Sequence, residues 1–153
     1  MSYSILLTDW QTHKADLMNI RTLVFMHEQN VSAADEWDGL DEQALHFLVL
    51  STAGTAIGCA RVLLESDEGK TRFHIGRVAI LKPFRNKGVG HQLMQAIIAH
   101  CTQTAPLNQM YLHAQIERQH FYETLGFVAE GDVFMDAGIS HISMHLAESD
   151  LAK

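Results

Sequence analysis

One glycine-bearing segment of the sequence has residue types and spacing that suit the binding of an anion. Arg85, Gly88 and Gly90 form the pattern Arg-x-x-Gly-x-Gly, after an apolar stretch typical of a strand and before a stretch typical of a helix. Glycines allow close approach of the backbone to a ligand, and the N–H groups at a helix start favour negative charge. Arg85 and Lys87 add formal positive charge. The segment therefore predicts a pyrophosphate site, with an ordinary strand-to-helix turn as the alternative.

The segment matches neither of two common phosphate fingerprints. A Walker loop would end in Gly-Lys-Ser/Thr, and a dinucleotide fingerprint would read G-x-G-x-x-G. The sequence contains neither the Walker ending nor the dinucleotide pattern at this segment. The sequence therefore disfavours a nucleotide hydrolase and a dinucleotide-dependent enzyme.

The distribution of charge supports an anion site in the same part of the chain. The formal charge of -7 argues against general nucleic-acid binding. All 18 acidic residues lie outside residues 70–116, and the other five basic residues leave that remainder at -13. An uneven distribution of this kind is expected of a chain that reserves a place for an anion, although chance clustering is the alternative. The +6 segment carries Lys70, Arg72, Arg77, Lys82, Arg85 and Lys87.

The elements that must position this segment follow from apolar periodicity and turn residues. The order of strands and helices predicts an α/β fold with a mixed sheet and helices on its faces. A length of 153 residues, without a repeat or linker, predicts a single domain over 1–153. Residues 28–43 are expected to form a loop or short helix. The expected strands are 3–8, 44–51, 55–64, 73–81, 110–114, 127–134 and 141–146, and the expected helices are 12–27, 90–103 and 117–125.

The sequence favours a cytoplasmic protein without a membrane partner. No apolar run approaches the roughly 20 residues that span a bilayer, and the first residues lack the features of a secretion signal. Cys59 and Cys101 have no metal or redox spacing, so both are expected to be inert core thiols in a reducing compartment.

Two motifs resemble those of the GNAT N-acetyltransferase superfamily. Arg85-x-x-Gly88-x-Gly90 is similar to its pyrophosphate loop, Q/R-x-x-G-x-G/A. The stretch Phe121–Phe127, FYETLGF, resembles its helix end FYEKLGF and departs mainly at Thr124. Flanking stretches are similar to the ElaA-like branch, so the likeness spans nearly the whole chain. These stretches are Arg21–Gln29, His113–Gln115 and Asp136–Met144.

The resemblance implies a fold and a cofactor site. The fold would be a mostly antiparallel central sheet of about seven strands, splayed at the cofactor site, with helices on both faces. The co-substrate would be acetyl-coenzyme A, with no metal. Gln115 stands where the superfamily often has Asn, so its role is carried over only weakly. The matching cofactor positions are Val78, Ala79 and Ile80 for the pantetheine arm, and Arg85, Asn86, Lys87, Gly88, Val89 and Gly90 for the pyrophosphate.

The resemblance also implies a reaction, the transfer of an acetyl group to a primary amine within a ternary complex. Tyr122 matches the tyrosine that would protonate the departing thiolate as a general acid. An unperturbed phenol, with a pKa of ~10, carries its proton at pH 7. The alternative for Tyr122 is an aromatic side chain on the buried face of a helix. The alternative for the whole chain is a non-catalytic acyl-coenzyme A sensor or interaction module.

The general base is left open between Glu28, His74 and His113, and water alone could also remove the proton. For either histidine an exposed or hydrogen-bonded imidazole without a catalytic role is the alternative. His74 is expected to share a strand face with Val78 and Ile80, because the three have the same parity.

The acceptor is expected to be a small-molecule or peptide amine, attracted by carboxylates within 28–42, although a solvated acidic loop is equally expected. Superfamily members often dimerise, so the resemblance allows a homodimer. His141 and His145 would lie ~13 Å apart on a strand and lack a third ligand, so no metal site is expected.

Overall fold

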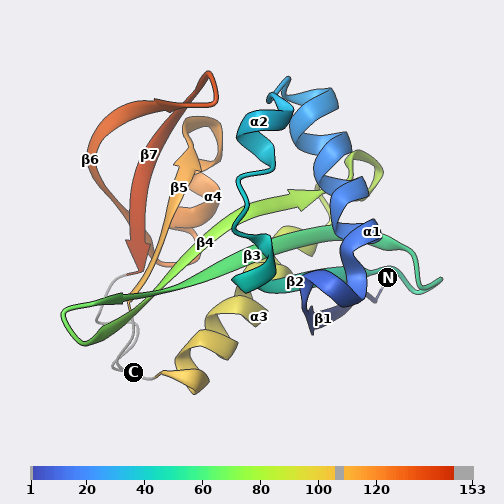
Figure 1. Cartoon of the computed structure of the whole chain (residues 1–153), viewed down its shortest axis with the longest axis horizontal. Coiled ribbons are helices and arrows are strands. Elements are labelled where there is room, and N and C mark those ends of the chain that lie inside the picture. Colours follow the sequence, from blue (N-terminus) through green and yellow to red (C-terminus); the bar gives the residue numbers. More distant parts are fainter. Residues whose placement is uncertain (1, 106–108, 147–153) are drawn as a thin grey trace.

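A computed structural model describes residues 2–105 and 109–146 (Figure 1). Seven strands form one sheet in the order β1-β2-β3-β4-β5-β7-β6, and only the neighbours β4 and β5 run parallel. The predicted mixed, mostly antiparallel sheet of seven strands is therefore confirmed. The strands are β1 (Ser4–Thr8), β2 (Leu45–Leu50), β3 (Ala56–Asp67), β4 (Lys70–Ile80), β5 (Gln109–Gln115), β6 (Phe127–Asp136) and β7 (Ile139–Leu146).

Helices cover both faces of the sheet, as expected. An apolar cluster lies on each face of the sheet, between the strands and the helices, because neighbouring residues of a strand point to opposite faces. Phe47 of β2 packs in the cluster that contains α3, whereas the adjacent Leu48 packs in the cluster that contains α1. Figure 1 shows these two helices on opposite sides of the strands. The α-helices are α1 (Trp10–Arg21), α2 (Ala33–Glu36), α3 (Val89–Thr104) and α4 (Gln119–Glu123), and the short turns are η1 (Thr22–Glu28), η2 (Asp41–Gln43), η3 (Lys82–Phe84) and η4 (Ile116–Arg118).

The first helix differs from the single helix expected over 12–27. Asp9 caps α1 by accepting a hydrogen bond from the Thr12 N–H at 2.8 Å. After α1 the chain widens into the π-helical turn η1, which ends where the Gln29 N–H donates to the Val24 carbonyl, five residues back. Such turns often occur at functional sites. Here η1 places Val24 and Phe25 in the wall of the cavity described below.

The sheet opens between β4 and β5. Their ladder joins Arg72–Ile75 to Gln109–Leu112 and then stops, although β4 continues to Ile80 and β5 to Gln115. The two strands therefore separate at their ends, as the predicted splay requires. Beyond the ladder, the edge of each strand that faces the other is left for a ligand.

A bulge lies in β4 where the splay begins. The β3–β4 register shifts by one residue, so Ala60 of β3 faces both Arg77 and Val78 of β4. Arg77 has a φ of 52°, in the left-handed region. That conformation costs a residue with a Cβ roughly 1–2 kcal/mol, so other contacts must hold Arg77 in place.

The bulge overturns one expectation from the sequence. His74 was expected to share a face with Val78 and Ile80, and this is wrong. Ile75, Val78 and Ile80 all belong to the cluster under α3, whereas the His74 ring stacks on Tyr111 on the other face. The extra residue of the bulge reverses the alternation partway along the strand.

Candidate functional site

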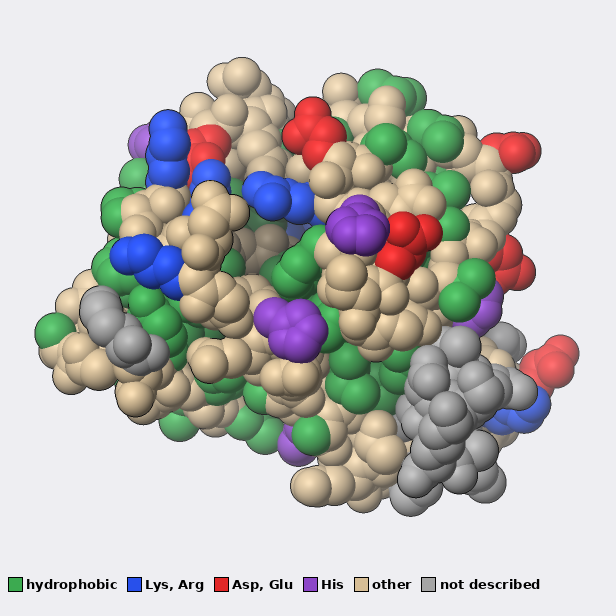
Figure 2. All heavy atoms as spheres, turned by 180° about the vertical axis from the view of Figure 1, so that it is seen from behind, with side chains coloured by type: hydrophobic (Ala, Val, Ile, Leu, Met, Phe, Trp, Pro, Cys, Tyr) green, Lys and Arg blue, Asp and Glu red, His purple; other side chains and the backbone are tan. Residues whose placement is uncertain are grey.

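A cavity of about 640 Å³ lies between the splayed ends of β4 and β5. Its volume is within the usual range of small-molecule sites, ~300–1,000 Å³. Figure 2, seen from behind, shows the surface hollowed near its centre, with Lys and Arg side chains gathered at one side of the hollow. The cavity wall includes the end of η1, the glycine segment, α4 and the turn between β6 and β7.

The glycine segment presents unpaired backbone N–H groups to this cavity. Asn86 and Gly88 adopt positive φ values of 62° and 78°. Gly88 precedes α3 without a side-chain cap. Within the described residues, no N–H from Asn86 to His91 donates to a backbone carbonyl, and the first such bond runs from the Gln92 N–H to the Gly88 oxygen. A run of free N–H groups at a helix start is a ready site for an anion.

Arg85 holds the segment in place. Its guanidinium donates to both carboxylate oxygens of Glu28 at 2.9 Å, and its Nε donates to the Ile80 carbonyl at 2.8 Å. The side chain therefore joins the segment to η1 and to β4. Glu28 balances the positive charge of Arg85. Lys87 is therefore the segment's remaining formal positive charge.

Tyr122 of α4 projects into the cavity from the face that α3 covers. The side chain is 9% exposed, and its ring makes edge contacts with Phe121 and Phe127 at 5.0 and 6.1 Å. Burial raises the pKa of the phenol to about 12. The phenol makes no hydrogen bond to any described residue. It therefore keeps its proton at neutral pH and is free to donate it.

His74 and His113 line the opposite side of the cavity, on neighbouring strands. Their ring centroids lie 4.8 Å apart, and the His74 ring also stacks on Tyr111 at 4.4 Å. Burial, with a contribution from His113, lowers the pKa of His74 to about 4. Burial also lowers the pKa of His113. Both imidazoles are therefore neutral at pH 7.

A third histidine in the cavity wall, His141, was considered in the sequence only as a metal ligand. The residue is 8% exposed, its Nδ1 lies 2.7 Å from the Ile139 carbonyl, and its ring stacks on Phe134. The register of β5 and β7 places His141 directly opposite Gln115 of β5. The alternation of side chains along β7 was visible in the sequence, whereas the pairing of β5 with β7 was not.

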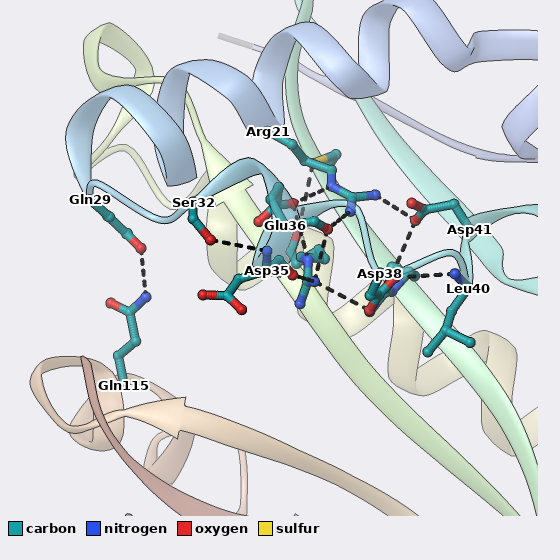
Figure 3. Close-up of polar contacts among 12 residues, drawn as sticks. Arg21, Gln29, Ser32, Asp35, Glu36, Asp38, Leu40, Asp41 and Gln115 are labelled. Carbon is teal, nitrogen blue, oxygen red and sulfur yellow. Dashed lines mark hydrogen bonds and ion pairs between the residues drawn. The ribbon is translucent and has the colours of Figure 1, made fainter. Parts of the chain in front are cut away.

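Gln115 connects the two sides of the cavity. Its amide Nε2 donates to Oε1 of Gln29 at 2.8 Å, a contact drawn as a dashed line in Figure 3. Gln29 directly follows η1. The last residue of β5 is thus tied to the same turn that holds Arg85 through Glu28.

The carboxylates of 35–42 are largely engaged with arginines (Figure 3). Glu36 and Asp41 are 2% and 6% exposed and both pair with the buried Arg21. The expectation of an acidic rim is therefore wrong for these two residues, which neutralise an interior cation. Asp38 pairs with Arg61 and Arg77.

Asp35 differs from these carboxylates. It lines the cavity, and its side chain makes no ion pair with any described residue. Trp37, two residues on, packs over the Arg21 guanidinium at 4.9 Å, so it contacts a cation of its own chain.

Metal and thiol chemistry find little support in the described ranges 2–105 and 109–146. No group of three or more His, Cys, Asp or Glu side chains there could hold a metal ion. No helix of that part is long and apolar enough to cross a membrane. Cys59 and Cys101 are buried, and burial raises the pKa of each thiol to about 12, so neither is a nucleophile at neutral pH.

Known proteins of similar sequence support the resemblance. The family described as "Acetyltransferase (GNAT) domain" matches residues 18–148. Protein ElaA of Escherichia coli is 35% identical over 129 residues, which cover 84% of this chain and 83% of ElaA. "Uncharacterized N-acetyltransferase YjcF" of Bacillus subtilis is 32% identical over 130 residues, with 84% and 89% covered.

Solved structures agree with the sequence matches. The crystal structure of Escherichia coli ElaA matches with a TM-score of 0.84 and 30% identity, over 95% of this chain and 100% of that one. An acyl-CoA N-acyltransferase from Pseudomonas aeruginosa matches with a TM-score of 0.82 and 30% identity, over the same shares. With both of its motifs at one cavity and these relatives along most of its length, the chain belongs to the GNAT family of acetyltransferases.

Proposed function

We propose that the protein transfers an acetyl group from acetyl-coenzyme A to a primary amine, while both substrates occupy the cavity. The observation that carries the proposal is that one cavity contains the free N–H groups of 86–91, the open edge of β4 and the phenol of Tyr122. These groups suit the pyrophosphate, the pantetheine arm and the leaving thiolate of one cofactor.

The cofactor would lie along the split in the sheet. Its pyrophosphate would accept hydrogen bonds from the N–H groups of 86–91, with Lys87 nearby. The pantetheine amides would pair with the backbone of 78–80, because β5 does not pair with this part of β4. Gln115 and the Arg85–Glu28 pair would fix the walls on either side.

The reaction would proceed by direct attack. The amine nitrogen bonds to the thioester carbon, the carbon–sulfur bond breaks, and the nitrogen loses a proton. Tyr122 gives its proton to the departing sulfur, and its phenolate is reprotonated through solvent. The products are an acetylated amine and coenzyme A.

The acceptor would enter beside free carboxylates. Asp35 and Asp136 line the cavity from α2 and from the end of β6, and neither makes an ion pair with a described residue. Two unpaired carboxylates on the wall favour an acceptor that carries positive charge.

The test is the release of coenzyme A thiol from acetyl-coenzyme A in the presence of single primary amines: spermidine, 2-phenylethylamine and lysine amide. We expect saturable thiol release with at least one amine, and the acetylated product by mass spectrometry. Tight binding of acetyl-coenzyme A without release with any amine would contradict the proposal and favour a non-catalytic sensor.

A further inference from the structure

His141 is a buried imidazole whose hydrogen bond fixes which nitrogen carries the proton. Nδ1 lies 2.7 Å from the carbonyl oxygen of Ile139, and a carbonyl oxygen can only accept. Nδ1 therefore carries the hydrogen, and Nε2 of the neutral ring has a lone pair. Nε2 makes no hydrogen bond with any residue in the described part of the chain. A neutral imidazole held in this way can accept a proton at Nε2.

The ring is held rigidly at the cavity. Its plane lies 24° from that of Phe134, with centroids 5.9 Å apart, and the residue is 8% exposed although it lines the cavity. The hydrogen bond to Ile139 and the contact with Phe134 restrict rotation about both side-chain torsions. A base that is already oriented loses little entropy when the substrate arrives.

The register of the sheet places His141 close to where the thioester would lie. His141 pairs with Gln115 across β5 and β7, and side chains of directly opposed residues share a face with Cβ atoms ~4.5–5.5 Å apart. Gln115 is the last residue of β5, at the open end of the splay, and the chain continues through η4 into the helix of Tyr122. His141 and Tyr122 therefore lie at the same end of the cavity.

The other candidate bases are engaged or weakened. Both oxygens of Glu28 accept hydrogen bonds from Arg85. His74 stacks on Tyr111, and its pKa of about 4, lowered first by burial, makes it a poor proton acceptor. Burial lowers the pKa of His113 as well.

We propose that His141 is the general base, and that its Nε2 accepts the proton that the acceptor amine loses as it attacks the thioester. The inference rests on the proposed function. One proton moves from nitrogen to Nε2 as the carbon–nitrogen bond forms, and His141 later releases it to solvent. Of the charged and titratable groups that line the cavity, His113 on β5, Asp136 at the end of β6 and Arg118 on η4 lie on elements packed against β7, and His113 interacts electrostatically with His141.

The first test needs no acceptor. The ring nitrogens of ¹⁵N-histidine-labelled protein are recorded by NMR at neutral pH, and His141 is assigned by its loss in His141→Gln. We expect a protonated Nδ1 and an unprotonated Nε2, and we expect the Nε2 resonance to shift when acetyl-coenzyme A is added. A proton on Nε2 in the neutral ring would overturn the inference, whatever the protein's activity.

The second test compares His141→Gln with His145→Gln. His145 lies on the same strand and face, has a side chain 43% exposed, pairs with Glu130 and does not line the cavity. For His141→Gln we expect kcat to fall about 10²- to 10⁴-fold with an unchanged KM for acetyl-coenzyme A. Its residual rate should rise with pH, as hydroxide replaces the base. His145→Gln should retain the wild-type rate.

The outcomes separate the inference from the proposed function. If the wild-type protein releases thiol with one of the three amines and His141→Gln is as fast, only the inference fails. If the wild-type protein binds acetyl-coenzyme A but releases no thiol with any of them, both fail. If His141→Gln unfolds, the His141 ring is assigned in the wild-type protein by through-bond correlation to its own backbone, and the NMR measurement then decides.

Discussion

On one side of the cavity, in its wall and in the interior behind it, three arginines pair with three carboxylates, and elsewhere in the wall three histidines pack against aromatic rings. The first set, called here the charged wall, contains Arg21, Arg61 and Arg77 with Glu36, Asp38 and Asp41, of which Glu36, Arg61 and Arg77 line the cavity. The second contains His74, His113 and His141, packed against aromatic rings. The charged groups of the first set pair with one another, whereas Nε2 of His141 has no hydrogen-bond partner among the described residues.

This contrast teaches that the density of charge in a sequence is a poor guide to a site. The carboxylates of 35–42 stabilise a segment that has little regular structure of its own. Arg77, in the bulge of β4, donates to the carbonyl oxygens of Asp35 and Glu36 and to the carboxylate of Glu36. The charged wall thus holds the bulge in its strained conformation beside the proposed cofactor position.

The largest effect is expected where the charged wall loses one partner. Glu36→Ala leaves Arg21 and Arg77 without their shared carboxylate in the interior. We expect the free energy of unfolding to fall by roughly 3–5 kcal/mol, because an uncompensated buried charge is costly. Urea denaturation measures this. Glu42→Ala, at an exposed neighbour, is the control and should change stability by less than about 0.5 kcal/mol; equal effects would contradict the contrast.

The next effect is on rate and not on stability. Tyr122→Phe removes only the phenol oxygen and keeps the ring that packs in the core. We expect at least ~100-fold slower thiol release, because the leaving sulfur loses its proton donor. Calorimetry should find nearly unchanged affinity for acetyl-coenzyme A. If affinity, stability and rate fell together, the side chain would be structural.

A smaller effect is expected in the glycine segment. Gly88→Ala meets no atom within 4 Å, but its φ of 78° costs an alanine about 1–2 kcal/mol. We expect weaker binding of acetyl-coenzyme A, because relief of this strain turns the N–H groups away. Gly54→Ala is matched in φ and in open space and lies in the β2–β3 turn. It should lose similar stability and keep its affinity; a loss of affinity in both variants would exclude a specific role for the segment.

The smallest effect is a dependence of stability on pH in the charged wall. Burial raises the pKa of Asp38, but hydrogen bonds from Arg61 and the Leu40 N–H outweigh it and hold the pKa at about 2, below the usual 3.8. The stabilisation is therefore present above pH ~4 and is lost as the pH falls toward 2. Because the pair is partly exposed, we expect less than about 1 kcal/mol. Asp38→Asn should reduce this slope in urea denaturation between pH 4 and 2, and an unchanged slope would contradict the assignment.

Most of the fold was predictable from the sequence. All seven strands and the long helix α3 were placed to within a few residues, because apolar periodicity and turn glycines determine them locally. The glycine segment proposed to bind pyrophosphate and Tyr122 carry local motifs, so both were found as candidates. The structure brings them to one cavity.

Other features depend on pairing between distant parts of the chain. The bulge at Arg77 exists only relative to β3, so strand parity misplaced His74. The carboxylate of Glu28 is bound by Arg85, 57 residues away, and no local pattern shows that contact. The place of His141 in the cavity wall depends on the pairing of β7 with β5.

The most direct test of the account is calorimetric titration of the protein with acetyl-coenzyme A, with free adenosine as the control. The account predicts saturable 1:1 binding of acetyl-coenzyme A and much weaker binding of adenosine, which lacks the pyrophosphate. Absence of binding at millimolar acetyl-coenzyme A would contradict the account, because the free N–H groups of 86–91 would then have no pyrophosphate to bind.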